Sequence, residues 1–200
     1  MVKPVKHSAP VRASHEIRII GGTWKRTRLA VRDLPGLRPT PDRVRETLFN
    51  WLGQELGGWR CMDAFAGTGV LGLEAASRGA ADVVLVEQDR TLVEGIAATL
   101  LRLKAQGVRV VRGDGVATLR QAAPSSLDLV FIDPPFDAPL YEPALRAAAT
   151  ALSPSGWVYL EAPVAWTDAS LAPFGLCLHR HLKAGAVHAH LLRLADSAHA

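Results

Sequence analysis

From residue 60 onward, short apolar runs alternate with longer segments whose apolar positions recur every three or four residues. The short runs predict β-strands and the longer segments predict α-helices. The expected strands are residues 60–65, 82–87, 108–112, 128–132 and 156–161. The expected helices lie between them, near residues 70–78, 90–105, 115–122 and 141–151. Strands that alternate with helices predict a parallel sheet that is covered on both faces.

The last stretch of the pattern, LCLHRHLKAGAVHAHLLRL, predicts two further strands joined at Ala184-Gly185. The sheet then has about seven strands, with the last pair antiparallel, and we expect an α/β fold with a doubly wound, Rossmann-like sheet. In this register His181 faces His188 and His179 faces His190. Four imidazoles on one face could bind zinc, but a polar outer strand face is the more ordinary interpretation, and we predict no metal site.

The pattern before residue 60 is different. Residues 17–32 alternate weakly between apolar and basic residues around a Gly-Gly pair, which predicts a β-hairpin. A helix should follow, because Thr40 can cap it and Pro41 suits its first position. Apolar residues then recur at helical spacing until Gly57-Gly58, where the helix should end.

The composition fits one folded domain with an appendage. The chain has 200 residues, of which 48% are hydrophobic, and this is enough for a single core. No apolar run approaches the ~20 residues that span a bilayer, and the N-terminus lacks the apolar centre of a signal peptide. Cys61 and Cys177 suit buried thiols in a reducing cytoplasm. We expect a cytoplasmic protein with a disordered basic tail (1–16), an extension (17–57) and a main domain (58–195).

The positive charge is concentrated at the start of the chain. Residues 1–60 hold 12 Lys and Arg against 5 Asp and Glu, whereas residues 61–200 hold 11 against 14. A basic surface on the hairpin and the helix after it would attract a polyanion such as nucleic acid. A solvated basic tail that aids solubility is the alternative interpretation.

The first strand of the main domain runs into a glycine-rich loop, DAFAGTGVLGLEAASRG. Gly67, Gly69 and Gly72 fit the pattern G-x-G-x-x-G, and Glu87 closes the next strand 20 residues after Gly67. Both NAD enzymes and S-adenosylmethionine enzymes use this arrangement. Carboxylates at Asp63 and Glu87 favour S-adenosylmethionine, because a cationic sulfonium suits them better than a pyrophosphate does. The predicted cofactor-binding residues are Asp63, Phe65, Gly67, Gly69, Glu87, Asp114, Gly115 and Asp133. Of these, Asp114 could accept from the adenine amino group, and Gly115 would leave room for the ring.

The stretch DLVFIDPPFD carries the candidate chemistry. An apolar run ends on Asp133, Pro134 and Pro135, where the prolines remove two N–H donors and leave carboxylate and carbonyl acceptors. Such a cluster suits a group that only donates, such as an amine, and Phe136 offers a face on which a planar base can stack. We predict Asp133, Pro134 and Phe136 as catalytic residues. The alternative is that Asp133 caps a turn and the prolines end the strand.

This DPPF motif, with RIIGGTWKRTRL, GLRPTPDRVRETLFNWL and CMDAFAGTGVLGLEAASRGA, closely resembles the bacterial RsmD family over roughly residues 17–194. The resemblance implies a methyltransferase sheet and transfer of a methyl group to a guanine N2 in small-subunit (16S) ribosomal RNA. It implies that Asp133 and the Pro134 carbonyl hold the guanine amine while Phe136 stacks on the ring. It also implies that Asp63 and the glycine loop hold the methionine part of S-adenosylmethionine, with Glu87 on the ribose.

The resemblance also places ribosomal RNA on the basic extension. The predicted RNA-contacting residues are Arg18, Trp24, Lys25, Arg26, Arg28, Arg38 and Thr40. We expect a monomer whose substrate is ribosomal RNA, either free or within a small-subunit assembly intermediate. Arg43 and Arg45 could contact RNA or form a solvated ion pair with Glu46. Two other classes stay open: an amino-methyltransferase acting on DNA adenine N6 or a protein glutamine amide, and a non-catalytic RNA-binding or NAD-binding module.

Overall fold

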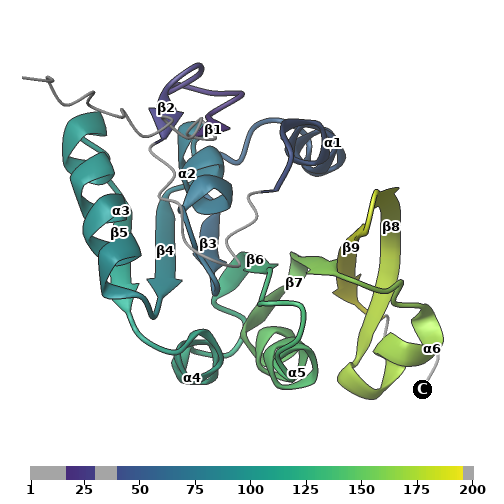
Figure 1. Ribbon diagram of the computed structural model, residues 1–200. Helices are drawn as coiled ribbons and strands as arrows, with labels where there is room; N and C mark the ends of the chain where they lie inside the picture. The colour runs from purple at the N-terminus through teal and green to yellow at the C-terminus, as the bar shows by residue number, and fades with distance from the viewer. Residues whose placement is uncertain (1–16, 30–39, 196–200) are drawn as a thin grey trace, which may run out of the picture.

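The computed structural model describes residues 17–29 and 40–195. Its centre is a seven-stranded sheet in the order β5-β4-β3-β6-β7-β9-β8 (Figure 1). Strands β3 to β7 pair in parallel, while β9 pairs antiparallel with both β7 and β8. The strands are β3 (Arg60–Asp63), β4 (Asp82–Glu87), β5 (Val108–Arg112), β6 (Leu127–Ile132), β7 (Leu152–Ala162), β8 (Leu176–Ala184) and β9 (Val187–Leu194). The predicted doubly wound sheet with an antiparallel last pair is confirmed.

Helices cover both faces of the sheet (Figure 1). The helices are α1 (Asp42–Leu52), α2 (Val70–Ser77), α3 (Arg90–Leu103), α4 (Gly115–Gln121), α5 (Tyr141–Ala151) and α6 (Asp168–Leu171), followed by a 3-10 turn (Ala172–Phe174). The first three helices share one buried apolar cluster with the sheet, and the last three share a second cluster on the opposite face. None of the helices within 17–29 and 40–195 is long and apolar enough to cross a membrane.

Strand β6 lies in the middle of the sheet, beside the strand that leads into the glycine loop. Leu129 to Ile132 are fully buried, because strands on both sides and helices on both faces exclude water. Burial of a side chain of this size contributes about 1.5–3 kcal/mol. Cys61 pairs with Leu129 and Asp63 with Phe131, so the predicted adjacency of the two strands is confirmed.

Helix α1 differs from the prediction at both ends. It begins at Asp42 after Pro41, and no side chain caps it. The hydroxyl of Thr40 instead makes a hydrogen bond with Glu161, so the capping role predicted for Thr40 is wrong. The helix ends at Leu52 because Gly53 takes a left-handed conformation with φ 96°, and its predicted end at Gly57-Gly58 is also wrong.

The predicted N-terminal hairpin is confirmed in a short form. Strand β1 (Ile17–Arg18) pairs antiparallel with β2 (Arg28–Leu29). Ile17, Leu29 and α1 residues such as Leu48 belong to the same buried cluster as Phe131 of the central sheet. The extension is therefore packed into the core of the main sheet.

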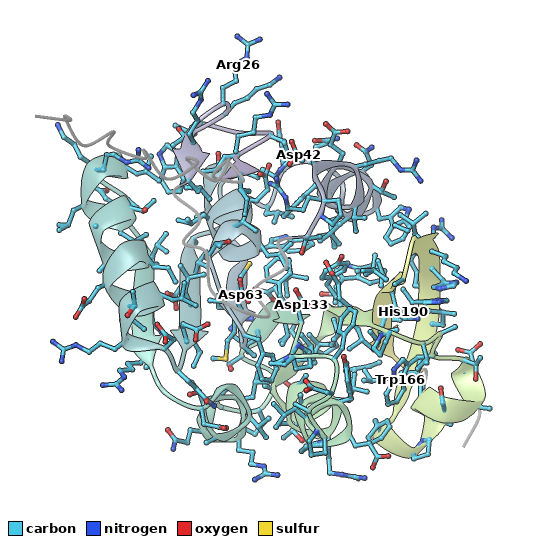
Figure 2. The ribbon with its side chains drawn as sticks, in the orientation of Figure 1. Arg26, Asp42, Asp63, Asp133, Trp166 and His190 are labelled. Atoms are coloured by element: carbon cyan, nitrogen blue, oxygen red, sulfur yellow. The ribbon has the colours of Figure 1, made fainter. Side chains whose placement is uncertain are left out.

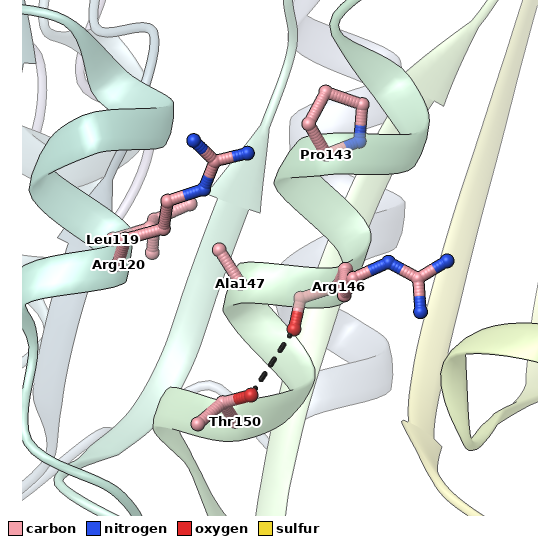
Figure 3. Close-up of a pocket in the computed structure, with 6 residues that line it drawn as sticks. All are labelled: Leu119, Arg120, Pro143, Arg146, Ala147 and Thr150. Atoms are coloured by element: carbon pink, nitrogen blue, oxygen red, sulfur yellow. Dashed lines mark hydrogen bonds between the residues drawn. The ribbon is translucent and has the colours of Figure 1, made fainter.

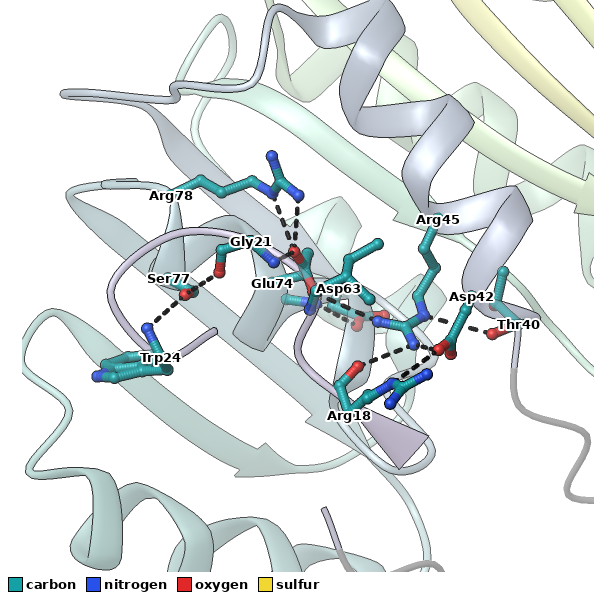
Figure 4. Close-up of polar contacts among 12 residues, drawn as sticks. Arg18, Gly21, Trp24, Thr40, Asp42, Arg45, Asp63, Glu74, Ser77 and Arg78 are labelled. Carbon is teal, nitrogen blue, oxygen red and sulfur yellow. Dashed lines mark hydrogen bonds and ion pairs between the residues drawn. The ribbon is translucent and has the colours of Figure 1, made fainter. Parts of the chain in front are cut away.

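A buried carboxylate, Glu74 of α2, fastens this extension to the main sheet (Figure 4). It accepts hydrogen bonds from the backbone N–H groups of Ile20 (2.9 Å) and Gly21 (2.7 Å) in the hairpin. It also pairs with the guanidinium groups of Arg45 (3.3 Å) and Arg78 (2.9 Å). One side chain on α2 thus holds both the hairpin and α1.

The hairpin turn is also bound to the C-terminal end of α2. The Ser77 carbonyl accepts from the N–H of Thr23 (2.7 Å), and its hydroxyl accepts from the N–H of Trp24 (2.9 Å). A Cβ on Gly22 would lie 1.8 Å from the Ser77 carbonyl oxygen, so only glycine permits this approach. The hairpin is therefore joined directly to the glycine-loop helix by backbone and side-chain hydrogen bonds.

The final hairpin also differs from the prediction. Its turn is at Gly185-Ala186, and His181 pairs with His190 while Lys183 pairs with His188. The predicted facing pairs, His181 with His188 and His179 with His190, are wrong because the turn lies one residue later. Strand β9 is covered by β7 on one side and β8 on the other, and this pairing sets the register.

Candidate active site

Three carboxyl groups meet at the C-terminal edge of the sheet. Asp63 ends β3, Asp133 directly follows β6 and Glu161 lies near the end of β7. The register pairs Asp63 with Phe131 and Phe131 with Tyr159. Since side chains alternate along a strand, Asp63, Asp133 and Glu161 point to the same face, which α1 and α2 cover. Figure 2 shows Asp63 and Asp133 close together at this edge.

In this carboxyl cluster (Asp63, Asp133 and Glu161), Asp63 and Glu161 are buried and Asp133 is partly exposed. Asp63 is 1% exposed and Glu161 is 3% exposed. Burial raises the pKa of Asp63 to about 7. Burial, followed by the charges of Glu161 and Asp63, raises the pKa of Asp133 well above its usual range. Buried like charges cost free energy, so the cluster is suited to a cationic ligand.

Asp63 is half satisfied by the protein itself. Its Oδ2 atom accepts from the N–H of Gly72 (3.2 Å), and the N–H of Phe65 also donates to the carboxylate. Its buried Oδ1 atom has no hydrogen-bond partner in the described residues. A buried acceptor without a donor is uncommon in folded proteins, and it is the kind of group that an ammonium ligand would satisfy.

The glycine loop after β3 has the shape that the sequence motif predicts. Gly67 and Gly69 have φ of 54° and 78°, which favour glycine, and Gly69 directly precedes α2. Glu87 accepts from the N–H of Gly67 (2.8 Å) and from the N–H of Asp89 (2.8 Å). Glu87 therefore ties the loop to the end of β4, and contact of its remaining lone pairs with a ribose stays a prediction.

Asp114 and Gly115 lie where β5 leads into α4. Asp114 caps α4 by accepting from the N–H of Ala117 (2.7 Å), and it also accepts from the Gln88 side chain (3.1 Å). A Cβ on Gly115 would lie 1.9 Å from the Ala64 carbonyl oxygen. The reason predicted for this glycine, room for an adenine ring, is therefore wrong, because the chain's own backbone fills that space. Contact of Asp114 with adenine stays a prediction.

The DPPF loop presents acceptors beside an exposed ring. Pro134 is buried, and the ring of Phe136 is 37% exposed. Tyr141, at the start of α5, has a buried hydroxyl without a hydrogen-bond partner in the described residues. Its pKa is raised to about 12 by burial and by the negative charge of Asp133. Together these groups suit a planar molecule that carries an amine.

Sequence reasoning missed Glu161 and Tyr159. The hydroxyl of Tyr159 donates to Glu161 (2.7 Å), and both side chains are buried. One signal could have found them, since VYLEAP resembles LVFIDPP: an apolar run ends on an acid, and a proline follows, one residue later in VYLEAP and at once in LVFIDPP. The contact of Glu161 with Thr40 had no signal in the sequence, because the two residues are brought together only by the tertiary fold.

The predicted RNA-contacting residues fall into different environments. Lys25 and Arg26 are exposed at the hairpin turn, and Figure 2 shows Arg26 projecting from the molecule. Arg18 is exposed and pairs with Asp42 (3.3 Å). Trp24 is partly buried and packs against the core, which limits its use as a stacking surface.

Of the other basic residues in that prediction, Arg28 is exposed, and Arg38 lies outside the described residues. Arg45 is completely buried. Neither interpretation offered for Arg45, an RNA contact or a solvated ion pair, is correct. Arg43 remains exposed on α1.

Three of the four histidines, His181, His188 and His190, stack on one another, and His179 lies apart from them. His190 is fully buried, and its Nε2 atom accepts from the N–H of Trp166 (3.0 Å) while Nδ1 faces the Leu160 carbonyl (3.2 Å). His179 instead packs against Trp157. His181 and His188 are hydrogen-bonded to each other (2.9 Å). The ring nitrogens of His181, His188 and His190 lie within 4.8 Å of one another, although both nitrogens of His190 are already engaged, and the absence of a metal site stays a prediction.

A shallow groove of about 200 Å³ lies between α4 and α5, lined by Leu119, Arg120, Pro143, Arg146, Ala147 and Thr150 (Figure 3). Leu119 and Ala147 belong to the apolar cluster on the face opposite the carboxyl cluster. The groove therefore has no part in the candidate active site.

Known proteins share this arrangement. A family model described as "Conserved hypothetical protein 95" matches residues 17–193. The chain is 43% identical over 180 residues to Ribosomal RNA small subunit methyltransferase D of Escherichia coli (strain K12), covering 87% of this chain and 88% of that protein. It is 40% identical over 154 residues to the protein of the same name from Haemophilus influenzae, covering 74% of this chain and 80% of that protein.

A solved structure is also similar to this chain in both sequence and fold. The structure described as "Putative methyltransferase yhhF from Escherichia coli" has a TM-score of 0.77 and 37% sequence identity, and the match covers 90% of this chain and 98% of that chain. The family model spans the extension as well as the main sheet. The chain belongs to the RsmD family of ribosomal RNA small subunit methyltransferases.

Proposed function

We propose that this protein transfers a methyl group from S-adenosylmethionine to the N2 amine of a guanine in small-subunit ribosomal RNA. Membership of the RsmD family makes it an S-adenosylmethionine-dependent ribosomal RNA methyltransferase. The guanine N2 target is the finer part of the proposal. The observation that carries it is the loop after β6, where Asp133 and the donor-free Pro134 stand beside the exposed ring of Phe136.

The residues present fit the cofactor. The unpartnered Oδ1 atom of Asp63 would accept from its ammonium group, and the loop from Gly67 to Gly69 would allow close backbone approach. Glu87 and Asp114 would bind the ribose and the adenine. When bound, S-adenosylmethionine supplies an electrophilic methyl group on a sulfonium.

The residues of the DPPF loop would orient the target. An exocyclic amine is a weak nucleophile, because its lone pair is delocalised into the ring. The carboxylate of Asp133 and the carbonyl of Pro134 would accept its two N–H bonds and direct the lone pair, so that catalysis comes largely from positioning. Phe136 would stack on the base, with a contribution of about 1–3 kcal/mol. Asp133 or water would take the proton after transfer.

The extension would bind the RNA backbone. Lys25 and Arg26 are exposed on a hairpin that is fixed to α2, so phosphate contacts there would hold the RNA relative to the carboxyl cluster. Extrusion of a paired base costs a few kcal/mol, which favours a target that is already unpaired. We therefore extend the proposal to ribosomal RNA within an assembly intermediate, where the target base would be unpaired. We also propose that the protein is a monomer and acts in the cytoplasm.

The test is to incubate the protein with labelled S-adenosylmethionine and separate pools of ribosomal RNA, small-subunit particles, DNA and protein. RNA from a strain that lacks the gene should accept label, and digestion should release N2-methylguanosine from one position. Label on adenine N6 or on a glutamine amide would replace the proposed target. Label on another position of guanine would refute the N2 assignment while leaving the RNA substrate in place.

A further inference from the structure

Glu161 is a buried carboxyl group that none of the predicted roles uses. The pairing of Ile132 with Leu160 places Asp133 beside Glu161 on adjacent parallel strands, with both side chains on the same face. Glu161 is 3% exposed. A second buried carboxyl group beside the catalytic acid is costly to the fold, so its presence calls for an explanation.

Two hydroxyl groups make hydrogen bonds that stabilise the charged form of Glu161. The hydroxyl of Tyr159 donates to it (2.7 Å), and the hydroxyl of Thr40 makes a second hydrogen bond. Burial raises the pKa of Glu161, and these two hydrogen bonds together with the charge of Arg45 offset part of that rise, although Arg45 is itself paired with Glu74 and Asp42. Two of these partners, Thr40 and Arg45, come from the N-terminal extension.

Several ionisable groups face this pair of acids. They are Asp63 on β3, Tyr159 on β7, Arg45 on α1 and Tyr141 on α5, and Asp137 after the DPPF motif acts in turn on Tyr141. Among the charged groups that act on Asp133, Glu161 has the larger effect and Asp63 the smaller, and both raise its pKa. Glu161 is thus the neighbour with the greatest control over the proton affinity of Asp133.

We propose that Glu161 is a positioning residue for methyl transfer: its carboxylate, held by Tyr159 and Thr40, keeps the neighbouring Asp133 a strong acceptor for the target amine. The inference rests on the proposed function, in which Asp133 accepts the amine. A carboxylate with greater proton affinity forms a stronger hydrogen bond to an N–H donor and leaves more electron density on the nitrogen. Through Thr40, the extension would help to set this property of the catalytic acid.

The sign of the pH effect follows from the charges. Asp133 is a charged acceptor only when ionised, because protonation turns one of its two oxygens into a donor, so methyl transfer should fall as the pH drops through its pKa. Glu161→Gln keeps the shape and the acceptor oxygen for Tyr159 and Thr40 but removes the negative charge. The pKa of Asp133 should then fall, and the acid limb of the pH profile should move to lower pH by about one unit or more.

The experiment measures kcat and KM for methyl transfer to ribosomal RNA between pH 5 and 9, for the wild type and Glu161→Gln. We expect the shift of the acid limb together with a lower plateau kcat. Glu161→Asp, which restores the charge, should return the midpoint toward the wild-type value, whereas a merely structural role would give no such return. Glu94→Gln, at an exposed carboxylate on α3, is the matched control and should leave the profile unchanged. An acid limb at the same pH in the wild type and Glu161→Gln would overturn the proposal.

A second measurement separates this inference from the proposed function. Carbon-13 NMR of aspartate-labelled protein, with Asp133→Asn to identify the signal, reports the titration of Asp133 without any substrate. The midpoint should fall in Glu161→Gln even if the true target is not guanine N2. An unchanged midpoint would refute the effect of Glu161 on Asp133, whereas absence of wild-type transfer to RNA would refute only the proposed substrate.

Discussion

The protein has two sites with buried carboxyl groups, the single residue Glu74 and the carboxyl cluster, and they differ in how far their negative charge is compensated. Glu74 is fully buried, and it is matched by two guanidinium groups and two backbone N–H groups. The carboxyl cluster of Asp63, Asp133 and Glu161 has only hydrogen-bond donors and the shared charge of Arg45, and one oxygen of Asp63 has no partner in the described residues. The compensated site, at Glu74, stabilises the fold. The uncompensated site, the carboxyl cluster, favours the binding of a cationic ligand.

The largest effect should follow loss of the central acid of the uncompensated site. Asp133→Ala should abolish turnover, by a factor on the order of 10³ or more, because the target amine loses its main acceptor. Cofactor affinity should stay nearly intact, since Asp63 and the glycine loop remain. Single-turnover rates with labelled cofactor and calorimetric binding of S-adenosylhomocysteine measure the two quantities. A rate near that of the wild type would remove Asp133 from the chemistry.

Loss of the compensated carboxylate should damage the fold itself. Glu74→Ala leaves Arg45, Arg78 and two backbone N–H groups without their acceptor, which should cost about 3–5 kcal/mol in the free energy of unfolding. Chemical denaturation measures it. Glu94→Ala, which removes an exposed partner of Arg90, should cost no more than about 0.5 kcal/mol. Equal losses in the two variants would show that Glu74 is not the anchor described above.

Removal of charge from the uncompensated site should stabilise the cofactor-free protein. Asp63 has a pKa of about 7 in the folded state, above its unfolded value of about 4. Its ionisation therefore costs nothing below pH 4, and the cost grows until the pH exceeds 7. Asp63→Asn should be more stable than the wild type by about 4 kcal/mol at pH 8, since each pKa unit is worth about 1.4 kcal/mol, and this difference in unfolding free energy should narrow toward pH 5. Denaturation of both proteins at several pH values tests it, and a gap that does not vary with pH would argue against the raised pKa.

The smallest effect should come from the hairpin surface. Lys25→Ala with Arg26→Ala should reduce the slope of log binding constant against log salt concentration by about 1.4–1.8, because two phosphate contacts are lost. Fluorescence anisotropy with ribosomal RNA between 50 and 300 mM salt (about 10 Å of screening length at 0.1 M) measures the slope. Arg120→Ala, on the opposite face of the sheet, serves as the control. A slope equal to that of the wild type would exclude this loop from the RNA interface.

The parallel strands could be predicted from the sequence because each one is apolar along its whole length. The run from Leu129 to Ile132 is fully buried, and such continuous runs are typical of strands covered on both faces. The position of Asp133 beside the glycine loop followed from the order of a doubly wound sheet. Local chemistry and chain order together were therefore enough to place most of the carboxyl cluster.

The features that could not be predicted depend on contacts between distant residues. The final hairpin offers two turns that differ by one residue, and pairing of β9 with β7, such as His190 with Leu160, selects Gly185-Ala186. Arginine is usually a surface residue, but Arg45 is buried because it pairs with Glu74 on α2. The Thr40 hydroxyl similarly meets Glu161 across more than 100 residues of sequence.

Helix α2 sets the distance between the glycine loop and the hairpin turn. It has 8 residues, or about 12 Å of length at 1.5 Å per residue. The glycine loop lies at its first residue, and the hairpin turn is bound to Ser77 at its last. The length of α2 therefore sets the separation between the glycine loop and the hairpin turn that carries the exposed Lys25 and Arg26. If the hairpin binds RNA as proposed, this length would fix how far the bound phosphates lie from the DPPF loop, and the fold would select a nucleotide by its position as well as by its chemistry.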